Sequence, residues 1–191
     1  MYTVDSRGWL KDCRQCVSPN QDERPADTDV ELVVVHAISL PPGIFGGMFI
    51  EELFLNQLDV SSHPYFARLD GLRVSAHLLI DRKGELTQFV SFDARAWHAG
   101  ESTWHGRNAC NDFAIGIELE GCDEKPFEPA QYEQLVQVMA ALIARYPKLD
   151  AATVCGHSDI APHRKTDPGP LFDWQRFSDL LGSCTSTRRS R

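Results

Sequence analysis

The spacing of hydrophobic residues predicts strands and helices along most of the chain. Residues 32–38 are an apolar run rich in β-branched side chains, which is typical of a strand buried on both faces. Residues 113–120 alternate between large apolar residues and small or acidic ones, so they predict a strand with two different faces. Between Leu135 and Tyr146 the apolar residues recur at helical spacing, which predicts an amphipathic helix over 130–146.

Weaker patterns complete the predicted fold. Residues 74–80 and 85–90 flank a polar segment that ends in Gly84, which indicates a β-hairpin. We also expect a short helix at 48–58, a strand at 152–156 and a last helix at 173–182. Helices beside several strands, with a hairpin among them, predict an α/β (α+β) fold: a single domain with a central mixed β-sheet flanked by helices.

The two ends of the chain differ from the middle in composition. Residues 1–30 are polar and irregular, so we expect an N-terminal arm packed on the core. Residues 31–182 hold the predicted domain, and 191 residues in total suit one such unit. Residues 183–191 are small, polar and basic, and we expect a flexible tail because they can bury too little surface to become ordered.

Charge and cysteine content narrow the possible partners and compartment. Lys and Arg number 19 against 27 Asp and Glu, and the net charge of −8 disfavours nucleic acids and anionic membranes as partners. The polar first residues suggest no signal peptide, so we expect a cytoplasmic protein. In that reducing compartment the six cysteines are expected to be free thiols, including the lone Cys13-x-x-Cys16 pair.

Three residues are candidate metal ligands because of their context. His36 lies in a predicted buried strand, where an unpaired imidazole would be costly. His157 follows another predicted strand, and Asp167 precedes Pro168, which favours an extended backbone at the carboxylate. Two histidines and one carboxylate with an open fourth position form a catalytic zinc ligand set. Taken singly, however, a histidine in such a position is more often a structural, hydrogen-bonded residue than a metal ligand.

Other polar residues are candidates for catalysis beside such a metal. Lys165 lies two residues before Asp167 and could stabilise an oxyanion. Glu118 and Glu120 share a strand face with small residues, which would leave room for a ligand above the sheet, and either carboxylate could act as general base. The residue pattern does not choose between them. We expect His77 and His98 to be structural or to support other residues.

Six ordered segments of the sequence resemble the AmpD-type N-acetylmuramyl-L-alanine amidases, zinc enzymes that share a fold with peptidoglycan recognition proteins and T7-type lysozyme. The resemblance covers nearly the whole chain, from about residue 8 to 177. The matching segments are Val35–Gly43, Arg73–His77, Arg95–Gly100, Cys110–Phe113, Gly116–Gly121 and Gly156–Pro170.

The resemblance implies a particular site at the end of the sheet. It implies one zinc ion per chain held by His36, His157 and Asp167. It also selects Glu118 as the group that activates the attacking water, and Lys165 as the group that stabilises the tetrahedral intermediate.

The resemblance also implies an activity and a substrate. Such enzymes cleave the lactyl–L-alanine amide bond of 1,6-anhydro-N-acetylmuramyl peptides during peptidoglycan recycling in the cytoplasm. Arg73 and Arg107 are the implied substrate-binding residues, and we expect a monomer whose partner is a small muropeptide. In bacteria with an inducible chromosomal β-lactamase, loss of this activity derepresses the lactamase.

The chain departs from the family pattern at three positions near the expected site. Ala37 stands where the family often has Asn, Ala109 where it often has Arg, and His163 where it often has an acidic residue. The predicted ligands and catalytic residues are all present, so these changes bear on recognition of the sugar and stem peptide rather than on the reaction.

Two other functions stay open at this stage. A non-catalytic peptidoglycan-binding module could use the same fold, but it would be expected to lose a zinc ligand. An amidase acting on intact murein would be expected to carry an export signal or a wall-binding domain.

Overall fold

A mixed six-stranded β-sheet forms the centre of the protein, as the sequence predicted. The protein was analysed as a computed structural model, and residues 2–189 are described, with side chains to residue 184. Across the sheet the strands are β1 (Arg14–Gln15), β5 (Leu86–Gln88), β4 (Leu78–Ile80), β9 (Ala114–Glu120), β3 (Leu32–Ile38) and β10 (Val154–Gly156). β4 and β5 pair antiparallel, and the other neighbouring strands of this sheet run parallel.

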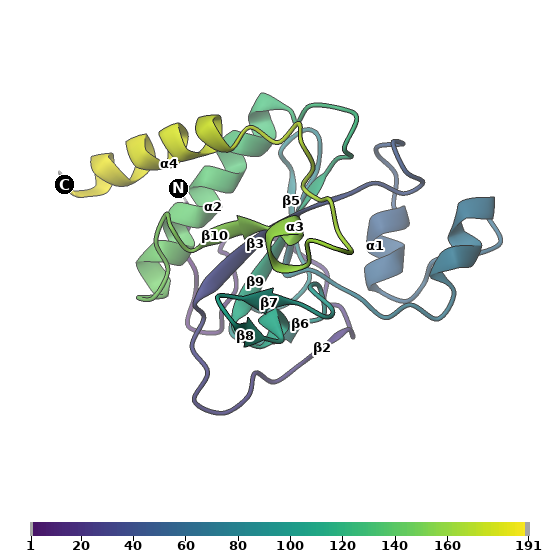
Figure 1. The fold of residues 1–191 in the computed structure, drawn as a ribbon, viewed down its shortest axis with the longest axis horizontal. Coiled ribbons are helices and arrows are strands. Elements are labelled where there is room, and N and C mark those ends of the chain that lie inside the picture. Colours follow the sequence, from purple (N-terminus) through teal and green to yellow (C-terminus); the bar gives the residue numbers. More distant parts are fainter. Residues whose placement is uncertain (1, 190–191) are drawn as a thin grey trace.

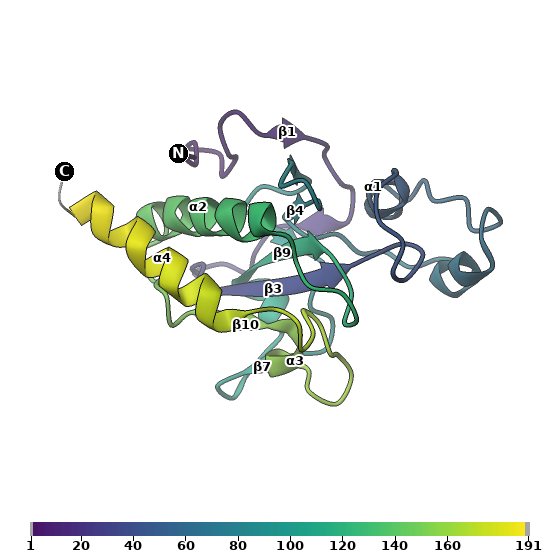
Figure 2. The same cartoon turned by 90° about the horizontal axis from the view of Figure 1, so that it is seen from above.

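Helices and short elements cover both faces of this sheet (Figure 1). The long helices α2 (Pro129–Arg145) and α4 (Trp174–Arg189) lie along one face, whereas β7 and α3 lie on the other (Figure 2). Helix α1 (Phe49–Phe54) stands at one end of the sheet. The remaining elements are η1 (Pro64–Leu69), β2 (Gln21–Asp22), β6 (Arg95–Ala96), β7 (Thr103–Trp104), β8 (Arg107–Asn108), η2 (Cys110–Asp112) and α3 (His157–Ile160).

Helix α2 is fixed to the sheet by the polar residues at its start as well as by its apolar face. The backbone N–H of Glu128 donates to Gln131 Oε1, which satisfies a donor at the helix start. The same buried Gln131 donates through Nε2 to the carbonyls of Ile80 and Glu120, in β4 and β9. Apolar residues at helical spacing then pack on the sheet as predicted, among them Leu135 and Leu142.

Strand β9 is buried on both faces, which corrects two expectations. We predicted that small residues would leave room for a ligand above this strand, but at Gly116 the space is filled. A Cβ atom added to Gly116 would lie 2.4 Å from His98 Cγ. We also predicted that Phe113 shares the face of Ile115. Phe113 instead packs on the opposite side with Leu32, because its ψ of 2° is not extended and the alternation begins only after it.

The N-terminal arm lies against the core, and its contacts are specific. β1 pairs with β5, and β2 pairs with β6. Leu10 is fully buried, and its backbone N–H donates to the buried side chain of Gln88. A segment that reads as polar and irregular in the sequence is therefore part of the packed domain.

The C-terminal helix is longer than predicted. We expected the last helix to end at residue 182, but α4 continues to Arg189 in the structure. Once a helix is nucleated, each further residue adds a backbone hydrogen bond, so a helix can extend beyond its buried face. Residues 190 and 191 lie outside the described residues.

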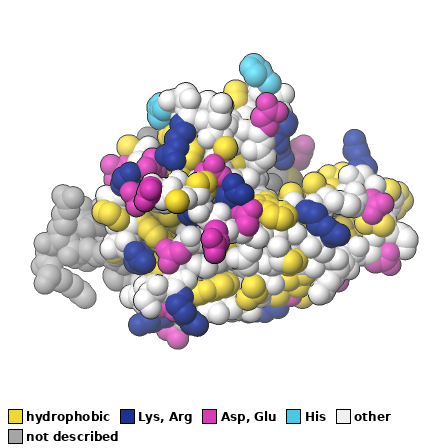
Figure 3. Space-filling view, turned by 90° about the horizontal axis from the view of Figure 1, so that it is seen from below, with side chains coloured by type: hydrophobic (Ala, Val, Ile, Leu, Met, Phe, Trp, Pro, Cys, Tyr) yellow, Lys and Arg dark blue, Asp and Glu magenta, His cyan; other side chains and the backbone are white. Residues whose placement is uncertain are grey.

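Basic and acidic side chains are interspersed on the surface that Figure 3 shows. Surface ion pairs of this kind include Arg107 with Glu31 at 2.7 Å and Lys148 with Asp29 at 3.1 Å. Within residues 2–189, the helices lack the combination of length and apolar character that crossing a membrane requires.

Candidate active site

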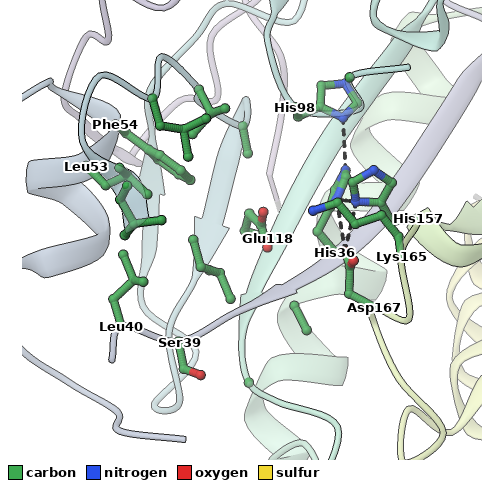
Figure 4. A pocket seen from close by; sticks show the side chains of 18 of the residues that line it. His36, Ser39, Leu40, Leu53, Phe54, His98, Glu118, His157, Lys165 and Asp167 are labelled. Carbon is green, nitrogen blue, oxygen red and sulfur yellow. Dashed lines mark hydrogen bonds and ion pairs between the residues drawn. The ribbon is translucent and has the colours of Figure 1, made fainter. Parts of the chain in front are cut away.

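A cavity of about 710 Å³ opens where the parallel strands β3, β9 and β10 end. Side chains at the carboxyl ends of parallel strands meet at one edge of a sheet, which is where open α/β sheets bind ligands. Here β3 contributes His36, β9 contributes Glu118, and β10 leads directly into His157. Figure 4 shows a polar cluster on one side of the cavity and apolar side chains, including Leu53 and Phe54, on the other.

The three predicted metal ligands come together in this cavity. His36 Nδ1 lies 2.9 Å from His157 Nδ1, and Asp167 Oδ2 lies 3.2 Å and 3.1 Å from these two atoms. Register explains the first contact, because β10 pairs in parallel with β3 and aligns Gly156 with Val35, one residue before each histidine. Asp167 lies in the loop that follows α3. The backbone carbonyl of Asp167 accepts a hydrogen bond from the backbone N–H of Ser158, which ties this loop to the start of α3.

The hydrogen bond on the outer side of the His157 ring indicates that the cluster fits a cation. His157 Nε2 lies 3.1 Å from the carbonyl oxygen of Ala99, which can only accept, so this nitrogen carries the proton. His157 Nδ1 therefore directs a lone pair at His36 and at the Asp167 carboxylate. Electron-rich atoms this close repel one another unless a positive charge lies between them, and the set of donors is one that zinc uses.

Burial controls the charge on these ligands. Burial lowers the pKa of His36 to about 4, although the nearby Asp167 carboxylate opposes that shift. The ring is therefore neutral near pH 7, as a ligand must be. Burial opposes ionisation of Asp167, but the two histidines beside it outweigh this effect and lower the pKa of the carboxyl.

Glu118 lies beside this cluster with an unusual carboxyl group. It is the register partner of His36 on the neighbouring strand, and it lines the cavity (Figure 4). Its Oε2 is buried and has no hydrogen-bond partner within the described residues. Burial raises the pKa of Glu118 well above its ordinary value, and the negative charge of Asp167 raises it further. A carboxylate held in this way is ready to accept a proton.

Glu120, the alternative that the sequence left open, has a different environment. Its carboxylate accepts hydrogen bonds from the backbone N–H groups of Gly46 and Arg82. The segment around Gly46 folds over the end of β9, so the Glu120 side chain is buried without lining the cavity. Glu120 therefore joins two loops to the strand, whereas Glu118 faces the cavity.

The remaining predicted residues divide between the cavity and the surface. Lys165 lines the cavity, and Figure 4 shows its side chain beside His36 and His157. Arg73 also lines the cavity. Arg107 is absent from the lining: its guanidinium pairs with Glu31 and stacks on Phe113, with Cζ 3.9 Å from the ring centroid.

The three residues that depart from the family pattern lie in different parts of the structure. Ala37 lines the cavity beside His36, so it changes the wall of the site. Ala109 adopts a left-handed backbone with φ 60° directly before η2. His163 lines a second hollow on the protein, together with Glu101 and Thr103.

The sequence reasoning missed two contributors to the site, Ala99 and Asn111. Asn111 lines the cavity, and the carbonyl of Ala99 contacts the outer nitrogen of His157. Neither residue belongs to a segment with periodic apolar residues, so the hydrophobic pattern does not mark them. Both nevertheless lie in segments that carry the family resemblance, which is the signal that could have found them.

Fold and site together define a class of protein. A mixed α/β sheet with a His-His-Asp cluster and a buried free carboxylate in one cavity is the arrangement of a hydrolase with a candidate metal site. Comparison with known families is specific: the profile described as N-acetylmuramoyl-L-alanine amidase matches residues 26–170. The chain belongs to this amidase family.

Individual relatives agree with this assignment. The chain is 57% identical over 174 residues to 1,6-anhydro-N-acetylmuramyl-L-alanine amidase AmpD of Enterobacter cloacae, covering 91% of this chain and 92% of that protein. Its fold matches the crystal structure of a selenomethionine AmpD derivative with a TM-score of 0.90 and 56% identity, covering 93% of this chain and 98% of the other.

A more distant structure contains a substrate. The amidase AmiD from E. coli, in complex with anhydro-N-acetylmuramic acid-L-Ala-D-γ-Glu-L-Lys, matches with a TM-score of 0.59 and 29% identity. The match covers 93% of this chain and 65% of AmiD.

Proposed function

We propose that this chain is a zinc-dependent amidase that hydrolyses the lactyl–L-alanine amide bond of 1,6-anhydro-N-acetylmuramyl peptides in cell-wall recycling. The observation that carries the proposal is the convergence of His36, His157 and Asp167 beside the unpartnered carboxyl of Glu118. The substrate follows from relatives that are more than half identical over nearly the whole chain and carry this activity in their name.

The ligand residues have a defined part in this proposal. His36 and His157 each present Nδ1, and Asp167 presents Oδ2, to one zinc ion per chain. Zinc bound there supplies Lewis-acid polarisation of the amide carbonyl and of water. The three residues fix its position at the edge of the sheet, next to the space that a scissile amide can enter.

Glu118 and Lys165 handle the proton and the developing charge. Glu118 accepts a proton from the attacking water, and the same carboxyl then delivers it to the amine of the departing L-alanine. Lys165 faces the cavity from the loop after α3, where its ammonium can meet the carbonyl oxygen as this oxygen becomes negative. Both groups act on charges that grow during the reaction, so each lowers the barrier more than it strengthens substrate binding.

Arg73 supplies a positive charge on the cavity wall for the carboxylates of the stem peptide. The apolar wall that includes Leu53 and Phe54 is suited to the carbon face of a sugar ring. Arg107 has its guanidinium bound to Glu31 and Phe113, so in this conformation we assign it no contact with the muropeptide.

The test is product analysis with an anhydromuramyl tripeptide, together with zinc analysis of the same preparations. We expect release of the tripeptide and of anhydro-N-acetylmuramic acid, and we expect His36→Ala to lose zinc and activity together. Glu118→Gln should keep zinc and lose about 10²–10⁴-fold in kcat. Glu120→Gln is the matched control, because it removes a carboxylate on the same strand face that does not line the cavity.

Two outcomes would contradict the proposal. A chain that binds the tripeptide substrate without cleaving it, with zinc present, would be a peptidoglycan-binding module. Cleavage of intact murein sacculi in preference to the anhydromuramyl peptide would indicate an enzyme acting on the wall itself.

A further inference from the structure

One short segment contacts the outer nitrogens of both histidine ligands. His36 Nε2 lies 2.9 Å from His98 Nδ1, and His157 Nε2 lies 3.1 Å from the carbonyl oxygen of Ala99. Residues 98 and 99 are consecutive, so the backbone conformation of this two-residue segment affects both rings. A shift of the segment would move the His98 side chain, which faces His36, and the Ala99 carbonyl, which faces His157, at the same time.

The backbone of residues 98 and 99 is held by Asn111. The side-chain oxygen Oδ1 of Asn111 accepts from the backbone N–H of His98 at 3.1 Å and of Ala99 at 2.8 Å. Two hydrogen bonds from successive N–H groups to one oxygen restrict rotation about the backbone between them. The side chain of Asn111 therefore holds both acceptors indirectly, without touching a ligand atom of His36 or His157.

Asn111 is itself on a rigid support. It is the middle residue of η2, whose first residue, Cys110, donates through its backbone N–H to Ser102 Oγ at 3.1 Å. Arg24, from the N-terminal arm, donates to the Asn111 carbonyl at 3.1 Å. The backbone that carries the Asn111 side chain is therefore held in place by these hydrogen bonds.

The ring of His98 is held between Gly116 and His36. It lies directly on Gly116, and its Nε2 is buried with no hydrogen-bond partner within the described residues. The contact with His36 is thus the side-chain hydrogen bond of His98 that the structure shows. For His36 to keep a lone pair on Nδ1, its Nε2 must carry the proton, and His98 Nδ1 is placed to accept it.

We propose that Asn111 is a positioning residue for the metal site, acting on His36 through His98 and on His157 through the Ala99 carbonyl. The proposal rests on the zinc site of the proposed function. Outer hydrogen bonds to histidine ligands set the tautomer and raise the basicity of the ring, and their loss costs about 10–100-fold in metal affinity. Because Asn111 holds the acceptors of both rings, its loss affects two of the three ligands together.

The experiment measures the zinc dissociation constant of purified protein by competition with a chromophoric chelator. We expect Asn111→Ala to weaken zinc binding by about 10–100-fold, and Asn111→Asp, which keeps an acceptor oxygen in the same place, to bind zinc within about threefold of the wild type. The absorption of the Co²⁺-substituted protein gives a second readout. Its d–d bands should change in Asn111→Ala, because the ligand geometry changes.

Asp81→Ala is the matched control. Asp81 Oδ1 also accepts from two backbone N–H groups, those of Lys83 and Glu85, in the turn between β4 and β5. Its removal costs similar hydrogen bonds far from the metal site. A role limited to stability would lower the melting temperature in both variants and leave both zinc constants unchanged, whereas the positioning role weakens zinc binding only in Asn111→Ala.

Each result decides between these roles. An unchanged zinc constant for folded Asn111→Ala, or an equal loss in Asp81→Ala, overturns the inference.

If Asn111→Ala does not fold, His98→Phe and His98→Asn test the same path one step closer to the metal. The Phe ring fills the place on Gly116 without an acceptor and should weaken zinc binding, whereas Asn keeps an acceptor at the δ position. A wild-type chain that binds no zinc refutes the proposed function itself.

Discussion

The imidazole of His98 lies so close to Gly116 that a Cβ atom on Gly116 would lie 2.4 Å from His98 Cγ. Directly before the neighbouring strand β4, His77 donates its backbone N–H to the Gly116 carbonyl at 3.0 Å and accepts the Gly116 N–H on Nδ1 at 3.0 Å. The backbone at Gly116 therefore has no freedom to retreat. Glycine in the middle of a buried strand normally weakens the strand. At Gly116 the absence of a side chain leaves the space that the His98 ring occupies.

Gly116→Ala is predicted to move His98 away from His36. The added methyl group forces the ring or the strand to shift, and overpacking of this kind costs about 1–3 kcal/mol of unfolding free energy. We expect a lower melting temperature together with weaker zinc binding, measured on the same sample. The control is Gly182→Ala in helix α4, where a Cβ meets nothing within 4 Å. That change should stabilise the protein by about 0.5–1 kcal/mol and leave zinc binding unchanged.

Glu118→Gln is predicted to stabilise the metal-free protein near neutral pH. Burial raises the pKa of Glu118 in the folded state above its unfolded value near 4.5, and the charge of Asp167 adds to the shift. The folded state then binds more protons than the unfolded state between these two values, so the free energy of unfolding falls as pH rises through this window. Glutamine cannot ionise and avoids this loss.

The measurement is urea unfolding of both metal-free proteins from pH 4 to pH 8. The stabilising effect of Glu118→Gln should be near zero below the unfolded pKa and should grow as pH rises. A difference in stability that is the same at all pH values would contradict the assignment of a raised pKa to Glu118. Such a residue, retained although it destabilises the fold, would be consistent with a functional role.

The sequence predicted the regular elements well because periodicity depends on local burial. Strands β3 and β9 and helix α2 bury continuous apolar faces, and each was expected within about two residues of its observed bounds. Phe113 was misplaced because a single residue of non-extended backbone precedes β9, and no apolar pattern marks such a residue.

The pattern of residues predicted the candidate site less well than it predicted the strands and helices. His36 and Asp167 are 131 residues apart in the sequence, so context could only suggest them as ligands of one metal, and the resemblance to a family selected that interpretation. Glu118 and Glu120 share a strand face because side chains alternate with a period of two. What separates them is the loop around Gly46, which folds over the end of β9 and binds the Glu120 carboxylate. A contact of this kind is tertiary and leaves no periodic signal.

The cysteines are predicted to be dispensable for stability. All six are free thiols in the structure, and burial raises the pKa of both Cys110 and Cys155. We expect six reactive thiols after unfolding without reductant, slow reaction of Cys110 and Cys155 in the native protein, and an unchanged melting temperature in reductant. Fewer than six thiols in the unfolded sample, or a lower melting temperature on reduction, would reveal a disulfide.

Arg24 is predicted to be the residue through which the N-terminal arm stabilises the loops around the site. Nη1 donates to the carbonyls of Asn111 and Asp112 at 3.1 Å and 2.9 Å, and Nη2 donates to those of Phe92 and Ala114 at 3.1 Å and 3.0 Å. Burial lowers the pKa of Arg24 to about 10, so the guanidinium is still charged near pH 7. Four charge-assisted bonds thus join one side chain to two separate segments, the loop at Phe92 and residues 111–114.

Arg24→Met should therefore cost about 3 kcal/mol of unfolding free energy, because buried carbonyls lose their donors. Arg24→Lys should not restore this stability, since one ammonium cannot reproduce the planar fork that reaches all four carbonyls. Arg7→Met is the control: Arg7 pairs with Asp5 on the surface, its side chain is 77% exposed, and its loss should cost less than about 1 kcal/mol. Chemical denaturation of the three variants measures these differences. Full rescue by lysine would show that Arg24 acts through its charge alone and not through the geometry of its hydrogen bonds.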